Sequence, residues 1–399
     1  MTDEFGVGMK KLCVIASVFG RYQGYIPLFV LSWLRAYPYV DIRIYLHDTI
    51  DPDVQKSLDL LDVSDHVVII EDCCKMVALT EKALENKAIS KSVRWLLHEP
   101  IFMKYEALYI GDIDIVIAYE PISLFEQHMR HCAFIGLPYS NMVRRNPAIE
   151  KSSGRELRRL SGLHFVQTKE YIKAVAPVMD SLVNQLNLLS ENKSDMYVID
   201  LFNNEMVLYD LVRLAGLGFP GDKPPPSVRT KNKLIKRPYK INPEQVNFRP
   251  HHGLHLGLAR GDGSLLNGSW SSSYKAYYSD FLELIDTDDY RKIERFFPPF
   301  LIEQINKFHE IGTLHKNTEV VEDIEITGNL AVRLRKHFII VYRRIRKRVT
   351  RIVRRIVNAH PVIKLCYTYF MKVVRCVFKL EVRKTTVEIP HERGRNQDE

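Results

Sequence analysis

The sequence predicts an α/β protein whose mostly parallel sheet is flanked by helices, and three observations lead to this fold class. Segments of strand type alternate with segments of helix type along residues 11–117. The segment at 108–117 is apolar on both of its faces, as in a strand that helices cover on each side. With 399 residues, of which 46% are hydrophobic and 26% charged, the chain can bury the core of one large domain.

The individual elements follow from runs of apolar β-formers and from apolar residues at helical spacing. We predict strands at residues 11–18, 41–46, 66–70, 108–117, 132–137 and 161–167. We predict helices at residues 25–37, 52–61, 79–104, 121–130, 168–189 and 203–215. The polar residues 140–159 are interpreted as a mobile loop, Thr168 as a helix N-cap, and the Pro- and Lys-rich residues 216–250 as a lid or binding loop.

Asp112 and Asp114 stand two residues apart within the predicted strand at 108–117. Because residues i and i+2 of an extended chain point to the same side, we expect both carboxylates to face one way. Two interpretations fit this spacing. The pair is either a polar exit from the strand into a turn, or a site where a divalent cation relieves the repulsion between two like charges. A cation held by two carboxylates keeps open positions for phosphate oxygens.

Other polar residues fall near the carboxyl ends of predicted strands or at the start of a helix, where parallel sheets bind ligands. Arg94, on the helix before the Asp strand, could reach a diphosphate, although a solvated helix arginine explains it equally well. Asn204 and Glu205 open a helix, where a Glu also suits the helix dipole. Three histidines within five residues favour contact with a ligand or phosphate. These are His251, His252 and His255.

The C-terminal segment differs in charge from the rest of the chain. Residues 329–384 hold 17 Lys and Arg against one acidic residue, whereas the residues before them are mildly acidic. Apolar residues recur at steps of three or four between 334 and 356, which predicts a basic amphipathic helix. Residues 362–380 are apolar but contain too many cations for a transmembrane span. We therefore expect this segment to lie in the headgroup plane of an anionic membrane.

Cysteine usage and the start of the chain bear on location. The six cysteines include no spaced pair of metal-ligand type, and most lie within apolar runs. This pattern favours buried, reduced thiols in a cytosolic protein. Residues 12–18 read as a first strand, because Arg21 interrupts the apolar run and no signal cleavage site follows. The expected location is the cytoplasm, peripheral on the inner face of the cell membrane.

In this order along the chain, the motifs resemble a GT-A glycosyltransferase of the glycogenin and lipopolysaccharide-galactosyltransferase type (carbohydrate-enzyme family 8). The most specific match is Leu-Tyr-Ile-Gly-Asp-Ile-Asp at 108–114, against the Leu-Tyr-Ile-Asp-x-Asp of the family. Softer matches are Ser-Gly at 161–162 and the histidine segment. The resemblance covers about residues 10–260. It departs from the family at Leu160, at the incomplete Asp-Gln pair, and in lacking Lys-Pro-Trp after the histidines.

The resemblance implies a GT-A fold and a metal-dependent, retaining transfer of sugar from a nucleotide donor, UDP-sugar above all, to a glycan or glycolipid of surface polysaccharide or lipopolysaccharide type. It implies Mn²⁺ or Mg²⁺ on Asp112, Asp114 and either His252 or His255. It places Tyr22, Tyr25, Arg94 and Asp112 at the nucleotide, and Glu205 or Asn204 beneath the anomeric carbon. The predicted domains are a catalytic domain at 1–260, its helical C-terminal part at 261–328, and a membrane-associating tail at 329–399.

Two other functions are compatible with parts of the sequence. A nucleic-acid-binding protein could use the basic tail, but an apolar stripe suits lipid and a nucleic-acid arm needs none, so we expect no nucleic-acid partner. A Mg²⁺-dependent nucleotidyltransferase could also use paired aspartates. It would usually show a Gly-rich phosphate loop with a Lys, which residues 20–24 match poorly.

Overall fold

The structure is a computed structural model that describes residues 10–145, 157–219, 243–244, 246, 248, 252–257 and 275–322. The chain divides into two compact units, Met1–Thr318 and Glu319–Glu399. From residue 323 onward the second unit lies outside the described residues, and so does the predicted tail at 329–399. Most of the predicted lid at 216–250 and His251 lie outside them as well. The predicted boundary between residues 260 and 261 stays a prediction.

A central sheet of six strands has the order β3-β2-β1-β4-β9-β6. Strands β3, β2, β1 and β4 are parallel, β9 is antiparallel to β4, and β6 is antiparallel to β9. This arrangement confirms the predicted α/β class with a mostly parallel sheet. The strands are β1 (Lys10–Val18), β2 (Asp41–Leu46), β3 (Val67–Ile70), β4 (Tyr105–Ile110), β6 (Tyr139–Ser140) and β9 (His164–Gln167).

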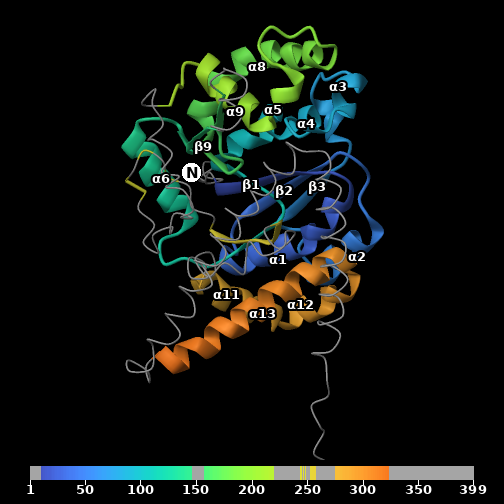
Figure 1. Cartoon of the computed structure of the whole chain (residues 1–399), viewed down its shortest axis with the longest axis vertical. Helices are drawn as coiled ribbons and strands as arrows, with labels where there is room; N and C mark the ends of the chain where they lie inside the picture. The colour runs from blue at the N-terminus through green and yellow to red at the C-terminus, as the bar shows by residue number, and fades with distance from the viewer. Residues whose placement is uncertain are drawn as a thin grey trace, which may run out of the picture. The chain divides into compact units, whose positions relative to one another are not determined.

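Alternate side chains of β1 enter two different cores, because successive residues of a strand point to opposite faces. Leu12 and Val14 join one core, and Cys13 and Ile15 join the other. The two groups of helices that complete these cores lie on opposite sides of the sheet (Figure 1). The first group is α1 (Ile26–Ala36), α2 (Pro52–Leu61), α11 (Lys275–Ile285), α12 (Asp288–Ile293) and α13 (Pro299–Glu322). The second group is α3 (Glu81–Glu85), α4 (Lys87–Ser90), α5 (Val93–Leu96), α8 (Thr168–Ser190) and α9 (Asn204–Leu214).

The strand order reverses at β1, which defines where a ligand fits. From β1 the chain moves outward to β2 and β3, then returns to place β4 on the other side of β1. In open α/β sheets, the crevice beyond the carboxyl ends of the strands at such a reversal is the usual ligand site. The carboxyl ends of β1 and β4 therefore mark the position in this fold where a ligand site is expected.

Smaller elements complete the described chain. Two small two-stranded sheets form from β5 (Ile115–Ile117) with β10 (Gly253–His255) and from β7 (Val143–Arg145) with β8 (Arg158–Leu160). The 3-10 helices are η1 (Gly20–Tyr25), η2 (Cys73–Met76), η3 (Pro100–Lys104), η4 (Ile199–Leu201) and η6 (Glu294–Phe296). Helix α6 spans Leu124–Ile135. Among the described residues, no helix combines the length and the apolar character that crossing a membrane requires.

The single strand predicted at 108–117 is wrong, and the error concerns the Asp pair. Strand β4 ends at Ile110, and both aspartates lie in the turn that leads to β5. The Gly111 amide donates to the carbonyl oxygen of Ile15 at 3.0 Å, which anchors the turn to the end of β1. The extended-chain argument for two parallel carboxylates therefore does not apply, and the turn itself has to set their directions.

Four further predictions are corrected. Residues 132–135 of the strand predicted at 132–137 instead form the last turn of α6, which Gly136 caps with a left-handed φ of 68°. The helix at 79–104 is broken into α3, α4, α5 and η3, because Thr80 and Asn86 cap new helices and Pro100 starts another. Thr168 is the first residue of α8 and Gln167 is its N-cap. The described ends of the loop at 140–159 pair as β7 and β8.

Candidate functional site

A pocket of about 250 Å³ lies at the carboxyl ends of β1 and β4, where the strand order reverses. Side chains from the end of β1 and the residues after it, from α5 and the residues before it, from the turn after β4, from α9 and from β10 converge on it. Among the predicted site residues, those that line the pocket are Tyr22, Arg94, Asp112, Asp114, Asn204 and His255. Residues from five separate parts of the sequence are therefore brought together.

Asp114 and His255 are neighbours in this pocket. His255 Nε2 lies 3.0 Å from Asp114 Oδ1, and the Asp114 side chain is only 9% exposed. The antiparallel pairing of β10 with β5 sets this contact, because it places His255 opposite Ile115. A Cβ on Gly253 would lie 1.9 Å from the Val116 carbonyl oxygen, so only glycine allows the two strands this close.

Asp112 is paired with a cation. Arg94 Nη1 donates to Asp112 Oδ1 at 2.6 Å, and both side chains are largely buried. The Arg94 guanidinium also lies over the Trp95 ring, 4.1 Å from its centroid. A planar guanidinium fixed on both sides in this way is suited to a phosphate or carboxylate oxygen.

Gly162 lies where three functional side chains meet. A Cβ at this position would lie 3.1 Å from Arg94 Nη2, 3.3 Å from Glu205 Oε1 and 3.4 Å from Asp112 Oδ2. The absence of a side chain at Gly162 is what lets these three groups approach one another. The loose Ser-Gly match in the sequence thus falls on a residue in contact with the site.

Glu205 and its neighbour Asn204 have different surroundings, although both open α9. Asn204 lines the pocket, and its side-chain amide donates to the Lys91 carbonyl oxygen at 3.5 Å. The Glu205 carboxylate accepts from the Gly162 amide at 3.0 Å and pairs with two arginines. Arg144 Nη1 lies 3.1 Å from Glu205 Oε1, and Arg159 Nη1 lies 2.9 Å from Glu205 Oε2. Glu205 is not among the pocket-lining residues.

The two predicted nucleotide-binding tyrosines have neighbouring rings, with centroids 5.9 Å apart, but only Tyr22 lines the pocket. Tyr22 lines the pocket, and its ring centroid lies 5.4 Å from that of Phe19, which also lines it. Tyr25 is buried behind it, with its hydroxyl donating to Gln304 Oε1 at 2.8 Å and its ring centroid 5.4 Å from that of Phe300. The structure therefore gives Tyr25 a packing role between η1 and α13.

His252 belongs to a buried polar cluster apart from the pocket. Its Nδ1 lies 2.6 Å from Glu120 Oε2 and its Nε2 lies 3.0 Å from His128 Nε2, so protein groups occupy both ring nitrogens. The contact with His252 lowers the pKa of Glu120 against the raising effect of burial, and burial lowers the pKa of His128 well below its usual value. The prediction that His252 joins the Asp pair is therefore corrected, and His255 is the histidine that the structure brings there.

The predicted cation can be tested against these contacts. Two ligand atoms that are adjacent on an octahedral ion, each bonded at about 2.1 Å, lie roughly 3 Å apart. His255 Nε2 and Asp114 Oδ1 have this separation. The Asp112 carboxylate instead contacts Arg94, and within the described ranges no set of three ligand atoms within 4.8 Å of one another includes Asp112. Asp114 Oδ1 and His255 Nε2 therefore have the separation of adjacent ligands on such an ion, whereas the Asp112 carboxylate pairs with Arg94.

Several residues of the site escaped the sequence analysis. Lys91 stands one helical turn before Arg94 and lines the pocket, as does Ser17 at the end of β1. Arg144 and Arg159, which hold Glu205, lie in the stretch interpreted as a loop. Paired arginines in an otherwise polar segment were the available signal, since clustered guanidinium groups need carboxylate partners.

Comparisons with known proteins give matches to solved structures. Neither a protein-family model nor a curated protein sequence matches the chain. Among solved structures, the chain is similar to the galactosyltransferase LgtC in complex with donor and acceptor sugar analogues, at 10% identity and a TM-score of 0.34, over 50% of this chain and 70% of that one. It is similar to glycosyltransferase GlyE of Streptococcus pneumoniae, at 13% identity and a TM-score of 0.31, over 51% and 43% of the two chains.

A third similar structure is core-mannan synthase A of Aspergillus fumigatus in its Mn/GDP form. The identity is 10% and the TM-score is 0.35, over 51% of this chain and 70% of that one. By their names the first two are a galactosyltransferase and a glycosyltransferase, and the third is a mannan synthase.

Proposed function

We propose that this chain is a glycosyltransferase that takes its sugar from a nucleotide-sugar donor. The observation that carries the proposal is the composition of the pocket at the strand reversal. Two carboxylates, Asp112 and Asp114, face two cations, Lys91 and Arg94, with His255 beside them. A diphosphate is the ligand that such a pocket suits, because the cations attract it and a bound divalent ion screens the carboxylates that would repel it.

The donor is proposed to lie along the pocket in a fixed direction. Phe19 and Tyr22 offer the aromatic surface for a base, with uracil as the proposed one. Lys91 and Arg94 lie toward the diphosphate. The sugar is then proposed to lie against Asn204, the first residue of α9 and a lining residue of the pocket.

Asp114 and His255 are proposed to hold Mn²⁺ or Mg²⁺, with Asp112 as a third ligand. When bound, the ion would neutralise charge on the diphosphate leaving group. The chain itself positions these ligands. The pairing of β10 with β5 holds His255 at Asp114, and Arg94 orients the Asp112 carboxylate. Arg94 also remains available as a second positive charge beside the leaving group.

Transfer with retention of configuration is proposed, with Asn204 beneath the anomeric carbon. Its amide oxygen can stabilise positive charge there, and its amide nitrogen is oriented by the Lys91 carbonyl. Glu205 is proposed as a positioning residue, because its carboxylate is already engaged by Gly162, Arg144 and Arg159. The contacts of Glu205 hold the glycine on which Arg94 and Asp112 converge.

The proposed acceptor is a glycan or glycolipid of a surface polysaccharide or lipopolysaccharide. The support is the sequence of the tail, whose 17 Lys and Arg between residues 329 and 384 suit an anionic membrane. The proposed location is therefore the inner face of the cell membrane. Sedimentation of the full chain with vesicles that contain anionic lipid tests this part, and equal sedimentation with neutral vesicles contradicts it.

The catalytic proposal is tested by incubating the full chain with a panel of nucleotide sugars and measuring released nucleoside diphosphate. Release is expected with one donor in the presence of Mn²⁺ and is expected to stop in EDTA. Asp114→Asn should abolish release while the exposed Asp65→Asn, as a matched control, keeps it. Release of nucleoside diphosphate that persists unchanged in EDTA would contradict a metal-dependent reaction.

A further inference from the structure

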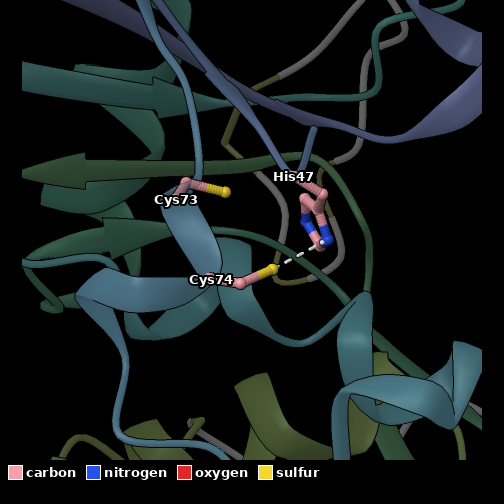
Figure 2. Close-up of side chains that lie close together, drawn as sticks. All are labelled: His47, Cys73 and Cys74. Carbon is pink, nitrogen blue, oxygen red and sulfur yellow. Dashed lines mark hydrogen bonds between the residues drawn. The ribbon is translucent and has the colours of Figure 1, made fainter. Parts of the chain in front are cut away.

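A second group of metal-binding side chains lies outside the pocket but at the same edge of the sheet. His47 directly follows β2, and Cys73 and Cys74 begin η2, shortly after β3. Because β2 and β3 are parallel neighbours, their carboxyl ends bring these residues together although they are far apart in the sequence. Figure 2 shows both sulfur atoms directed toward the side on which His47 lies.

The three ligand atoms form a compact triangle. A ring nitrogen of His47 and the Sγ atoms of Cys73 and Cys74 all lie within 4.8 Å of one another, and within the described part of the chain this is the one set of three that does so. His47 Nδ1 is 3.2 Å from Cys74 Sγ (Figure 2). Adjacent ligands on a tetrahedral Zn²⁺ with Zn–S and Zn–N bonds of about 2.3 and 2.0 Å lie roughly 3.5 to 3.8 Å apart, so small side-chain movements suffice.

The surroundings of His47 orient it as metal ligands are oriented in known sites. Its second ring nitrogen, Nε2, lies 2.9 Å from Ser17 Oγ. A proton on Nε2 shared with Ser17 leaves the lone pair of Nδ1 facing Cys74, and such an outer hydrogen bond commonly fixes the tautomer of a ligand histidine. Ser90 Oγ lies 3.2 Å from Nδ1, so a hydroxyl is also in contact with the nitrogen that faces Cys74.

We infer that His47, Cys73 and Cys74 form a Zn²⁺ site that is separate from the pocket. Two thiolates and an imidazole select a thiophilic ion of this kind, whereas the oxygen-rich pocket selects Mn²⁺ or Mg²⁺. On binding, each thiol gives its proton to solvent as its Zn–S bond forms.

Zinc at this site would tie the end of β2 to η2 and, through His47, fix Ser17. Ser17 is a wall residue of the pocket, and the His47 amide donates to the Val18 carbonyl oxygen at 2.9 Å. Zinc at this site would therefore stabilise the pocket wall. The inference does not depend on the proposed sugar transfer, because metal content can be measured without any donor.

The test is to load the full chain with zinc under reducing conditions, remove loose metal by desalting, and measure zinc per chain. We expect about one equivalent in the wild type and at least a tenfold weaker affinity in His47→Gln and in Cys74→Ser, a position that is half-buried. Controls that should retain zinc are Cys132→Ser, the double variant Cys366→Ser/Cys376→Ser, and Asp114→Asn. Retention in Asp114→Asn separates this site from the pocket.

A second measurement on the unaltered chain protects the test against a variant that fails to fold. Zinc should protect Cys74 from alkylation, as mapped by peptide mass, and cobalt should give the absorption of a thiolate-to-metal transition. Wild-type chain without retained zinc, equal zinc in Cys74→Ser and wild type, or unprotected Cys74 would each overturn the inference. A Cys73–Cys74 disulfide that persists in reductant would overturn it too.

Discussion

Arg94 Nη1 lies 2.6 Å from Asp112 Oδ1, and this ion pair joins α5 to the turn after β4. It balances one of the two carboxylates of the pocket in the absence of any ligand. A diphosphate with its cation is proposed to enter between the same two groups, so the guanidinium and the metal compete for Asp112. Removing Arg94 should therefore affect anion and metal binding in opposite directions.

Arg94→Met should weaken binding of the nucleoside diphosphate with Mn²⁺ by about 10- to 100-fold, equal to roughly 1.4 to 2.7 kcal/mol, because a charge-assisted hydrogen bond is lost. Binding of Mn²⁺ alone should strengthen, since Asp112 loses its competing cation. Isothermal titration calorimetry measures both. Arg35→Met, which removes a surface pair with Glu283, is the control. Parallel loss of both affinities would contradict the competition.

Gly162→Ala should impair the site and leave the fold intact. The new Cβ would lie 3.1 Å from Arg94 Nη2 and 3.3 Å from Glu205 Oε1, so these two groups must shift by a few tenths of an ångström, and it would touch Asp112 Oδ2 at 3.4 Å. A displacement of that size at reacting groups costs about tenfold or more in turnover. Turnover and melting temperature are compared with those of Gly218→Ala, where a Cβ meets nothing within 4 Å. Equal turnover in the two variants would contradict the convergence at Gly162.

Glu205→Gln should distinguish a positioning residue from a reacting one. The amide keeps the shape but loses the charge that pairs with Arg144 and Arg159, so we expect the free energy of unfolding to fall by about 1–3 kcal/mol. Turnover should fall less than it does in Asn204→Ala. Chemical denaturation and donor hydrolysis measure the two effects. A thousandfold loss of turnover at unchanged stability would make Glu205 the reacting carboxylate instead.

The sequence predicted those parts of the fold whose pattern is local. The bounds of β2 and α2 agree with the predicted ranges, because each is a short periodic run with clear ends. The run at 132–135 is apolar enough for either a strand or a helix, and only the left-handed Gly136 marks it as the end of a helix. The sequence predicted which residues belong to the site, but it did not predict which of them contact one another. The choice of His255 over His252 depends on the register of β10 against β5, which no local pattern contains.

Buried histidines should make stability depend on pH. Burial lowers the pKa of His164 to about 3, so below pH 6.5 the unfolded chain takes up a proton that the folded chain does not. Stability that is present above pH 6.5 is therefore lost as the pH falls. At pH 5.5 the loss is about 1.4 kcal/mol relative to pH 7.5 for this one group. Denaturation of the wild type and of His164→Phe at both pH values measures it, with the exposed His98→Phe as the control. An unchanged pH difference in His164→Phe would contradict the assignment.

The account as a whole depends on one pocket that binds a nucleotide sugar and a divalent cation together. Thermal unfolding of the full chain with each donor, with and without Mn²⁺, tests this claim most directly. We expect one donor to stabilise the chain by about 2.7 kcal/mol at a hundredfold excess over its dissociation constant, only with Mn²⁺ present, and not in Asp114→Asn. Equal stabilisation in EDTA, or none with any donor and Mn²⁺, would contradict the account.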